Sequence, residues 1–341
     1  MASERVIVCG AGGISGAWFK PLKDEGVQVV AVVDIKRENA EKRIAEFGFS
    51  GAKAYDDLDK ALAECASKAD FFIDITVPDA HCAVTCKALE AGLHVIGEKP
   101  MAASMAEARK MVATAEKTGK MYAVGQSRRY ELPQATLAQA AKSGEIGDLT
   151  TLNCDFYIGA HFGGFRDEMA SPLILDMSIH HFDMARMFSG QNAISVYAEE
   201  FNPKGSWYKG DVSANCLFEM TGGIHFAYRG SWCSEGCHTN WNGDWRVIGT
   251  KGTLLMAGDN MPSGEVVDGN EGFHRPKRPA VAPAASLPGT THHGELLDFL
   301  RFLRTGEKPQ TECHDNIQSL AMVFAAIASA RAGRRVKISE L

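Results

Sequence analysis

The chain has 341 residues, of which 45% are hydrophobic, and this length favours roughly two domains with ample core. Its formal net charge is −6, and acidic and basic residues are interspersed without a basic stripe, which argues against a nucleic-acid partner. No apolar run approaches about 18 residues, so no segment is expected to span a membrane.

The cysteine pattern indicates a reducing compartment. The nine cysteines form no C-x-x-C pair, and several lie inside apolar runs. Such a pattern is typical of buried thiols rather than of a disulfide framework or a zinc site. The first residues lead directly into an expected strand without a signal peptide. We therefore expect a cytoplasmic protein, and no metal in its functional site.

Short apolar runs alternate with helical patterns over the first 125 residues. The runs predict strands at 5–9, 27–33, 71–77, 94–97 and 121–124. Helices are expected from Ser15 onward and over 37–47, 57–66, 82–91 and 104–117. Buried strands that alternate with helices predict a parallel sheet covered on both faces.

The first expected strand runs into a glycine-rich turn, Gly10-Ala11-Gly12-Gly13-Ile14-Ser15-Gly16. Gly10 permits a tight turn, and Gly12 lets the backbone approach a pyrophosphate at a helix amino terminus, where N–H groups favour anions. Ser15 stands where the strict pattern has its third glycine, which Gly13 and Gly16 replace loosely. A purely structural turn is the alternative, but the position between strand and helix predicts dinucleotide binding.

Asp34 follows the second expected strand, about 20 residues beyond the glycines, where a carboxylate accepts hydrogen bonds from ribose hydroxyls. A carboxylate there repels a 2′-phosphate, which favours NAD. Lys36 and Arg37 follow closely and are able to accommodate that phosphate, so NADP stays open as the alternative cofactor.

Glu98-Lys99-Pro100 comes directly after the expected strand 94–97. A lysine at the carboxyl end of a parallel strand lies where the ligand crevice of such a sheet opens, and Pro100 stops the strand. By itself a solvated lysine is the safer interpretation. The glycine turn and Asp34 shift the interpretation toward a functional lysine.

After Gly125 the pattern changes to strands with few helices between them. Strands are expected at 149–158, 194–201, 212–220, 223–232, 245–249 and 253–256, which predicts a mainly antiparallel sheet. Five prolines between 258 and 288 predict an irregular loop. One helix is expected to end at Lys142, and two more are expected over 295–304 and 314–332. We therefore place one domain at 1–125 and an α+β domain at 126–341, whose terminal helices are able to pack back on the first.

A helix expected over 173–188 carries Asp176, His180 and Asp183 on one face. An aspartate one turn before a histidine orients the imidazole and stabilises its charged form, as an acid–base histidine requires. A solvated or capped polar face is the alternative. His181 is better explained as a core or interface histidine.

In their order and spacing, these residues resemble the Gfo/Idh/MocA oxidoreductase family, which includes inositol dehydrogenases and glucose–fructose oxidoreductase. The resemblance covers nearly the whole chain and rests on the glycine turn, Asp34, Thr76-Val77-Pro78-Asp79-Ala80-His81, Glu98-Lys99-Pro100 and Asp176-x-x-x-His180. The chain departs from the family at Ser178, where relatives often carry glycine, and at Gly16, where many carry a larger residue.

The resemblance implies an α/β fold, with an N-terminal Rossmann domain and a C-terminal domain built on a large open-faced sheet. It implies that Lys99 lies between nicotinamide and substrate, that His180 is the acid–base residue, and that Asp176 supports His180. The peptide bond before Pro100 is often cis in relatives. The residues that would hold NAD are Gly10, Gly12, Gly13, Ile14, Asp34, Thr76, Pro78, His81 and Glu98.

The implied reaction is hydride transfer between NAD(P) and a secondary alcohol or carbonyl of a small polyhydroxylated substrate, such as a sugar, a sugar derivative or a cyclitol. The aromatic and polar stretch 232–242 suits sugar faces and hydroxyls, and Arg128 and Tyr157 are candidates for the substrate pocket. The open sheet is often an oligomer interface, so a homodimer or homotetramer is expected. The alternatives are an NAD-dependent glycosidase, a non-catalytic NAD(P) sensor and an aldose–aldose oxidoreductase with a retained cofactor.

Overall fold

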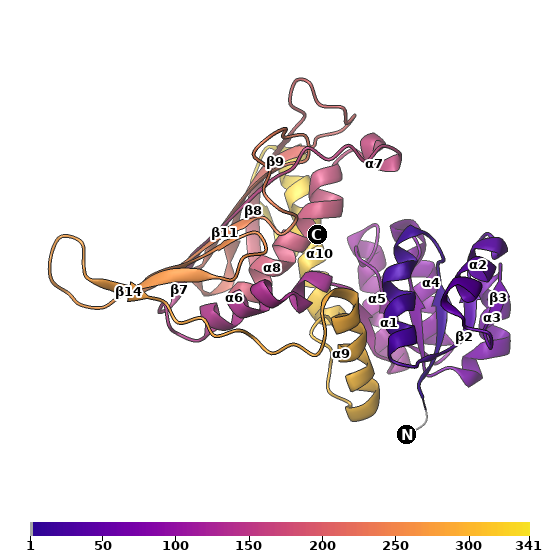
Figure 1. Cartoon of the computed structure of the whole chain (residues 1–341). Coiled ribbons are helices and arrows are strands. Elements are labelled where there is room, and N and C mark those ends of the chain that lie inside the picture. The colour runs from indigo at the N-terminus through magenta and orange to yellow at the C-terminus, as the bar shows by residue number, and fades with distance from the viewer. Residues whose placement is uncertain (1–2) are drawn as a thin grey trace. The chain divides into compact units, whose positions relative to one another are not determined.

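A computed structural model describes residues 3–341 of the chain (Figure 1). The chain forms two compact units: Met1–Tyr130 with Pro288–Ile317, and Glu131–Leu287 with Gln318–Leu341. The chain leaves the first unit after Tyr130, whereas the sequence predicted a domain boundary after residue 125. The stretch 288–317, which we placed by sequence in a second domain whose terminal helices are able to pack back on the first, is part of the first unit.

A six-stranded parallel sheet, in the order β3-β2-β1-β4-β5-β6, organises the first unit. Its strands are β1 (Arg5–Cys9), β2 (Gln28–Val33), β3 (Lys53–Tyr55), β4 (Phe71–Asp74), β5 (His94–Gly97) and β6 (Tyr122–Val124). The sequence pattern anticipates all of them except β3, whose three residues are too few for a periodic signal.

The helices of the first unit are α1 (Gly16–Asp24), α2 (Arg37–Phe47), α3 (Leu58–Cys65), α4 (Pro78–Glu90), α5 (Met105–Thr118) and α9 (Thr291–Thr305). Pro78 begins α4 instead of ending a strand, because its fixed φ and missing N–H suit the first helical position. Ser104 caps α5 by accepting a hydrogen bond from the backbone N–H of Glu107 at 3.2 Å.

The core of the first unit includes residues from both chain segments. Val6 and Val8 of β1 are fully buried, and they share one cluster with Phe19 of α1 and Phe299 of α9. The rings of Phe71 and Phe299 lie 5.6 Å apart. Because α9 supplies part of this core, the dinucleotide-type sheet depends on a helix far along the chain.

A nine-stranded sheet, in the order β14-β13-β12-β11-β7-β10-β9-β8-β15, organises the second unit. Its strands are β7 (Leu149–Tyr157), β8 (Ala193–Phe201), β9 (Ser213–Met220), β10 (His225–Ser231), β11 (Asp244–Gly249), β12 (Gly252–Ala257), β13 (Ser263–Val267), β14 (Lys277–Pro279) and β15 (Val336–Lys337). Strands β7 and β10 pair in parallel, whereas the other neighbours pair antiparallel. The predicted fold class is therefore confirmed.

One face of the second sheet is covered by helices (Figure 1). They are α6 (Leu132–Lys142), α8 (Ile179–Ser189) and α10 (Cys313–Ala332), and a short helix, α7 (Phe165–Glu168), lies in a loop. Phe182 of α8 packs on Phe218 of β9 at 4.8 Å between ring centroids. The next residue of β9, Leu217, is 52% exposed. The uncovered face therefore presents alternate strand residues to solvent.

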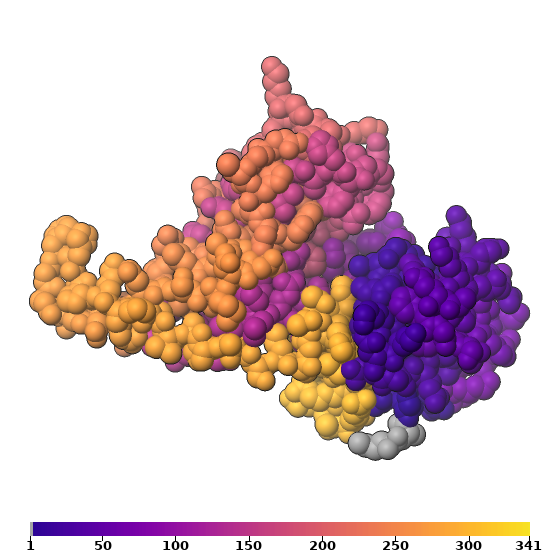
Figure 2. Space-filling view, viewed as in Figure 1, coloured from indigo at the N-terminus to yellow at the C-terminus, as the bar shows by residue number. Residues whose placement is uncertain are grey.

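The segment 258–288 is more ordered than its prolines predict, because it contains the hairpin of β13 and β14. This correction has a simple cause: β14 ends the sheet, where Pro279 needs no ladder hydrogen bond on its outer side. The hairpin projects from the body of the second unit (Figure 2). Among residues 3–341, no helix has the length and apolar character needed to cross a bilayer.

Candidate functional site

Most of the predicted cofactor residues gather at one edge of the parallel sheet. The carboxyl ends of β1, β2, β4 and β5 lead into Gly10, Asp34, Thr76 and Glu98. Strand β1 lies between β2 and β4, so the strand order reverses there. In open α/β sheets, ligands bind at the carboxyl ends beside such a switch point.

The glycine turn is tight at Gly10 and open at Gly12 and Gly13. Gly10 has a φ of +104°, and a Cβ on it would lie 2.4 Å from the carbonyl oxygen of Ile75, so only glycine fits. A Cβ on Gly12 or Gly13 would meet nothing within 4 Å, which leaves room beside the turn. Ile14 is 51% exposed on the same turn. The turn therefore fits a pyrophosphate at the start of α1.

Asp34 is held firmly beside that turn. One carboxylate oxygen accepts the backbone N–H of Ala11 at 2.8 Å. The other accepts the N–H of Lys36 at 2.9 Å and the side-chain amide of Asn39 at 3.1 Å. The carboxylate is thereby fixed in the position expected for an acid that binds a ribose.

A buried Asp–His pair lies just behind Thr76. Asp74 is fully buried at the end of β4, and one carboxylate oxygen lies 3.0 Å from Nδ1 of His81. Hydroxyls of Thr76 and Thr85 donate to the same carboxylate at 2.6 and 3.0 Å. Burial opposes a charged imidazole, but Asp74 outweighs it and raises the pKa of His81 above its ordinary value. Pro78, by contrast, is exposed.

Sequence reasoning missed Asp74, although one signal was present. A carboxylate inside the apolar run Phe71-Phe72-Ile73-Asp74-Ile75 is costly unless it is paired. Two of the residues that pair with it, His81 and Thr85, lie on the following helix, α4.

Glu98 is held by two residues distant in sequence. Its Oε1 accepts the indole N–H of Trp18 at 2.7 Å and lies 3.1 Å from Nε2 of His292, at the start of α9. Burial disfavours the carboxylate, but His292 and Trp18 hold the pKa of Glu98 below its ordinary value. Burial also disfavours the charged imidazole, yet Glu98 together with Glu295 raises the pKa of His292 to about 9.

This pairing positions the backbone of Lys99. The N–H of Lys99 donates to the second oxygen of Glu98 at 3.2 Å. The Lys99–Pro100 peptide bond is cis, as the resemblance implied, and Lys99 is half-buried whereas Pro100 is buried. The lysine thus comes from a fixed point at the carboxyl end of β5.

Arg128 is half-buried on a short 3-10 turn, Ser127–Tyr130, in the first unit. The turn is held from both sides. Its neighbour Arg129 pairs with Asp315 at 2.8 Å, and Tyr130 donates to Asp298 at 2.6 Å. Arg128 therefore has a fixed backbone.

The predicted acid–base pair lies in the second unit, in a helix that is not regular. Residues Leu173–Ser178 form a π-helical turn, and the α-helix begins at Ile179. The helix expected over 173–188 is therefore α-helical only from Ile179, so Asp176 lies on the π-helical turn and His180 and Asp183 lie on α8. A π-helical turn widens the spacing of side chains and often marks a functional site.

Asp176 and Asp183 have different surroundings. Arg166 of α7 donates to Oδ2 of Asp176 at 2.6 Å, and both side chains are partly exposed. Asp183 is buried and accepts the hydroxyl of Ser319 at 2.6 Å. Only Asp176, with half-buried His180, therefore remains a candidate for chemistry. Sequence reasoning missed Arg166, which lies in a loop without periodic pattern.

His181 is a core residue, as its interpretation predicted. It is fully buried, with its ring 4.7 Å from the ring of Phe156 and 5.5 Å from that of Tyr228. Its Nε2 lies 3.3 Å from the carbonyl oxygen of Trp241. Tyr228 in turn accepts a hydrogen bond from Ser178 at 3.0 Å.

The aromatic stretch 232–242 is divided between core and surface. Trp232 is buried, whereas Trp241 is 43% exposed. The ring of Phe162 lies 5.1 Å from Trp232 and 5.9 Å from Trp241. Tyr157, half-buried at the end of β7, pairs by its N–H with the hydroxyl of Thr239 at 3.0 Å. These residues form an aromatic surface on the second unit.

Known proteins with similar sequences contain the same two kinds of domain. Residues 4–126 match the model of an oxidoreductase family with an NAD-binding Rossmann fold, and residues 135–255 match the GFO/IDH/MocA C-terminal domain. The chain is 27% identical to D-apiose dehydrogenase of Paraburkholderia graminis, over 93% of this chain and 84% of that one. It is 24% identical to myo-inositol 2-dehydrogenase of Thermotoga maritima, over 99% of both.

Solved structures show the same fold. An oxidoreductase from Agrobacterium radiobacter in complex with NAD+, L-tartaric acid and magnesium superimposes with a TM-score of 0.86 over 99% of both chains, at 22% identity. The two matching domain models cover most of the chain in the expected order. The protein therefore belongs to the Gfo/Idh/MocA family and is an NAD-dependent oxidoreductase.

Proposed function

We propose that the protein transfers a hydride between NAD and a secondary alcohol or carbonyl of a sugar, a sugar derivative or a cyclitol. The observation that carries this proposal is the position of Lys99, which Glu98 holds at the carboxyl end of β5 in an NAD-binding sheet. The substrate class is supported by the relatives named as D-apiose and myo-inositol dehydrogenases.

The cofactor residues have distinct tasks. The turn of Gly10, Gly12, Gly13 and Ile14 binds the pyrophosphate, and Asp34 accepts the ribose hydroxyls. Thr76, Pro78, His81 and Glu98 line the remainder of the cofactor. Nicotinamide, when bound, accepts or donates the hydride. A carboxylate at position 34 favours NAD over NADP.

The proton and the charge are handled by this chain's own residues. As the substrate carbon loses hydride, Lys99 donates a hydrogen bond to the hydroxyl oxygen and stabilises its developing negative charge. His180 takes the hydroxyl proton on a ring nitrogen and returns it in the reverse direction. Asp176, itself held by Arg166, stabilises the protonated imidazole. Arg128 and Tyr157 contact the substrate hydroxyls that do not react.

The test is a panel of sugars and cyclitols, offered with NAD and with NADP, and followed by the absorbance of reduced nicotinamide. We expect oxidation of at least one polyol with NAD, and a smaller kcat/KM with NADP. If NAD binds but no polyol is oxidised and no matching carbonyl is reduced, the proposed reaction is wrong. The glycosidase and sensor alternatives gain no support from the relatives named above. Cofactor that stays bound through dialysis would favour an aldose–aldose oxidoreductase.

We further propose a cytoplasmic homodimer or homotetramer that associates through the uncovered face of the nine-stranded sheet. A groove of about 520 Å³ crosses this face, between strands β10, β7, β11 and β12. Exposed Leu217 and Leu255 lie on the same face, among charged residues such as Arg246. Apolar side chains on an open sheet face favour burial against a second sheet.

A further inference from the structure

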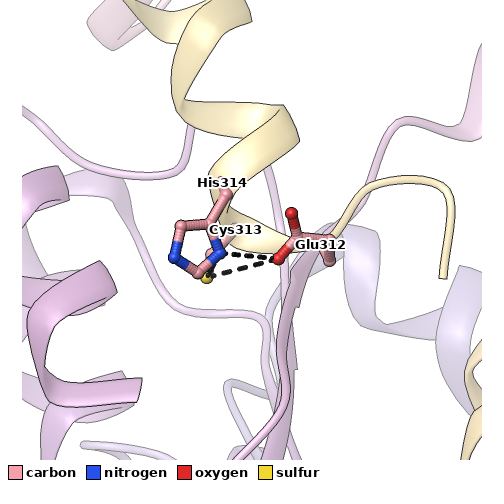
Figure 3. Close-up of side chains that lie close together, drawn as sticks. All are labelled: Glu312, Cys313 and His314. Atoms are coloured by element: carbon pink, nitrogen blue, oxygen red, sulfur yellow. Dashed lines mark hydrogen bonds and ion pairs between the residues drawn. The ribbon is translucent and has the colours of Figure 1, made fainter. Parts of the chain in front are cut away.

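Three consecutive side chains converge where α10 begins. Figure 3 shows Glu312, Cys313 and His314 turned toward one another at the first turn of the helix. Cys313 is buried, Glu312 is half-buried and His314 is exposed. Carboxylate, thiolate and imidazole are the ligand types that zinc binds in proteins.

The distances suit a metal ion. Sγ of Cys313 lies 3.6 Å from Nδ1 of His314 and 3.9 Å from Oε2 of Glu312. Nδ1 of His314 lies 2.8 Å from the same Oε2. A point in the middle of these three atoms lies about 2 Å from each, and zinc bonds are about 2.0–2.3 Å long, the sulfur bond being the longest. The sulfur needs to move outward by only a few tenths of an ångström.

A fourth residue supports the imidazole from behind. Nε2 of His314 lies 2.9 Å from Oε1 of Glu116, on α5 of the same unit. Histidines that bind a metal through one ring nitrogen typically donate the other N–H to a carboxylate, which fixes the ring and raises its basicity. Glu116 is positioned for that task.

A simpler arrangement explains part of this cluster. A doubly protonated His314 donates to both Glu116 and Glu312, and these two carboxylates raise its pKa above the ordinary value. That arrangement does not use the sulfur of Cys313. Cys313, however, is buried at the first helical position of α10, with its sulfur 3.6 Å from Nδ1 of His314. Whether the sulfur of Cys313 binds an ion therefore distinguishes a metal site from an ion-paired histidine.

We propose that Glu312, Cys313 and His314 bind a zinc-class divalent cation, with Glu116 orienting His314 and water as the fourth ligand. The ion ties the first turn of α10 to α5 within the first unit. This site is separate from the residues proposed for hydride transfer, and its role is structural. Three adjacent ligand-type residues, Glu-Cys-His, were its signal in the sequence, but they match no spaced ligand motif.

The test uses the full chain, freed of metal with a chelator and titrated with Co²⁺ as the probe. We expect one equivalent to produce a thiolate-to-cobalt charge-transfer band in the near ultraviolet, and Zn²⁺ to remove it. Cys313→Ser and His314→Gln lose the band. Glu116→Gln lowers the affinity about 10–100-fold, as loss of an outer carboxylate does elsewhere. Cys237→Ser, which changes an exposed cysteine of the second unit, keeps it.

Other outcomes overturn the proposal. A wild-type chain without the band, or a band that survives in Cys313→Ser, leaves only the ion-paired histidine. A band lost in Cys237→Ser assigns the metal to another site. Because His314 is exposed, His314→Gln keeps the fold, and an unchanged cobalt affinity in that variant also contradicts the proposal. None of these results depends on the substrate of the enzyme.

Discussion

At the scale of single residues, Lys99 carries the strongest prediction. Lys99→Ala removes the donor that stabilises the substrate oxygen, and loss of one such preorganised donor typically costs about 10²–10³ in kcat. NAD binding should stay within a few-fold, because the backbone contact of Lys99 with Glu98 does not use the side chain. Steady-state kinetics and NAD titration by fluorescence measure the two quantities separately.

The matched control for Lys99→Ala is Lys117→Ala, which removes an exposed lysine near the end of α5. It should change neither turnover nor NAD affinity. A Lys99→Ala variant with wild-type kcat would exclude the proposed mechanism, whereas a loss confined to NAD affinity would make Lys99 a cofactor residue.

Asp34 carries the prediction about cofactor choice. Asp34→Ala should weaken NAD by roughly 10–100-fold, the cost of a charge-assisted hydrogen bond, and should weaken NADP less, because repulsion of the 2′-phosphate disappears with the carboxylate. Isothermal titration with each cofactor measures both affinities. Since Asp34 also accepts hydrogen bonds within the protein, Asn39→Ala is the control: it removes one of these donors and leaves the Asp34 carboxylate in place. Equal losses for NAD and NADP would separate Asp34 from the ribose.

The sequence predicted those residues whose role follows from their place along the chain. Gly10 and Asp34 each follow a strand at a position that the fold fixes. Trp18 and His292 could not be found in this way, because their common partner Glu98 lies 80 and 194 residues away. Such contacts arise from packing in three dimensions, and the periodicity of the sequence does not predict them.

At the scale of elements, α9 stabilises β5 through the pair of His292 and Glu98. The pKa of His292 is raised to about 9, so the folded chain holds this proton at a pH where an unfolded chain has released it. The stabilisation is fully present below about pH 6.5 and is lost as the pH rises through about 9.

His292→Gln should remove this pH dependence while still donating to Glu98. Between about pH 6.5 and about pH 9, the free energy of unfolding of the wild type should fall by about 2–3 kcal/mol relative to the variant. Urea denaturation at the two ends of the range measures the difference. Parallel pH profiles for the two proteins would show that the proton on His292 does not stabilise the fold.

The errors in element prediction also have physical causes. Pro78 looked like the end of a strand but begins α4, because proline both stops strands and suits the first helical turn. The π-helical turn Leu173–Ser178 has an ordinary helical composition, so nothing in its pattern distinguishes it from an α-helix. The hairpin of β13 and β14 is short, with charged and proline residues typical of an edge.

At the scale of the whole molecule, the chain order of the units matters. The first unit is completed only when residues 288–317 return to it, after eight of the nine strands of the large sheet, and the ninth strand, β15, follows later in the chain. Length indicated two domains, and the terminal helices were expected to be able to pack back on the first, but periodic patterns do not say which helix does so. The reason is that α9 is amphipathic like any surface helix, and its apolar face does not specify which core receives it.

The uncovered face of the nine-stranded sheet supports the last prediction. Leu217, Ala227, Asn153, Arg246 and Leu255 are paired neighbours across five strands, so they form one row on that face. If copies of the chain associate there, each buries about 800 Å² in a standard interface. Lysines introduced at both ends of the row would then place unpaired charges in that interface.

Replacing Leu217 and Leu255 together by lysine should therefore reduce the mass measured by size-exclusion chromatography with light scattering from that of an oligomer to that of one chain. Phe273→Lys is the control, because Phe273 is 97% exposed on the loop between β13 and β14. Circular dichroism checks that the double variant is folded. A wild-type monomer would exclude the proposed association. An oligomer that persists in the folded double variant would place the interface elsewhere, because two buried ammonium groups without partners cost more than such an interface supplies.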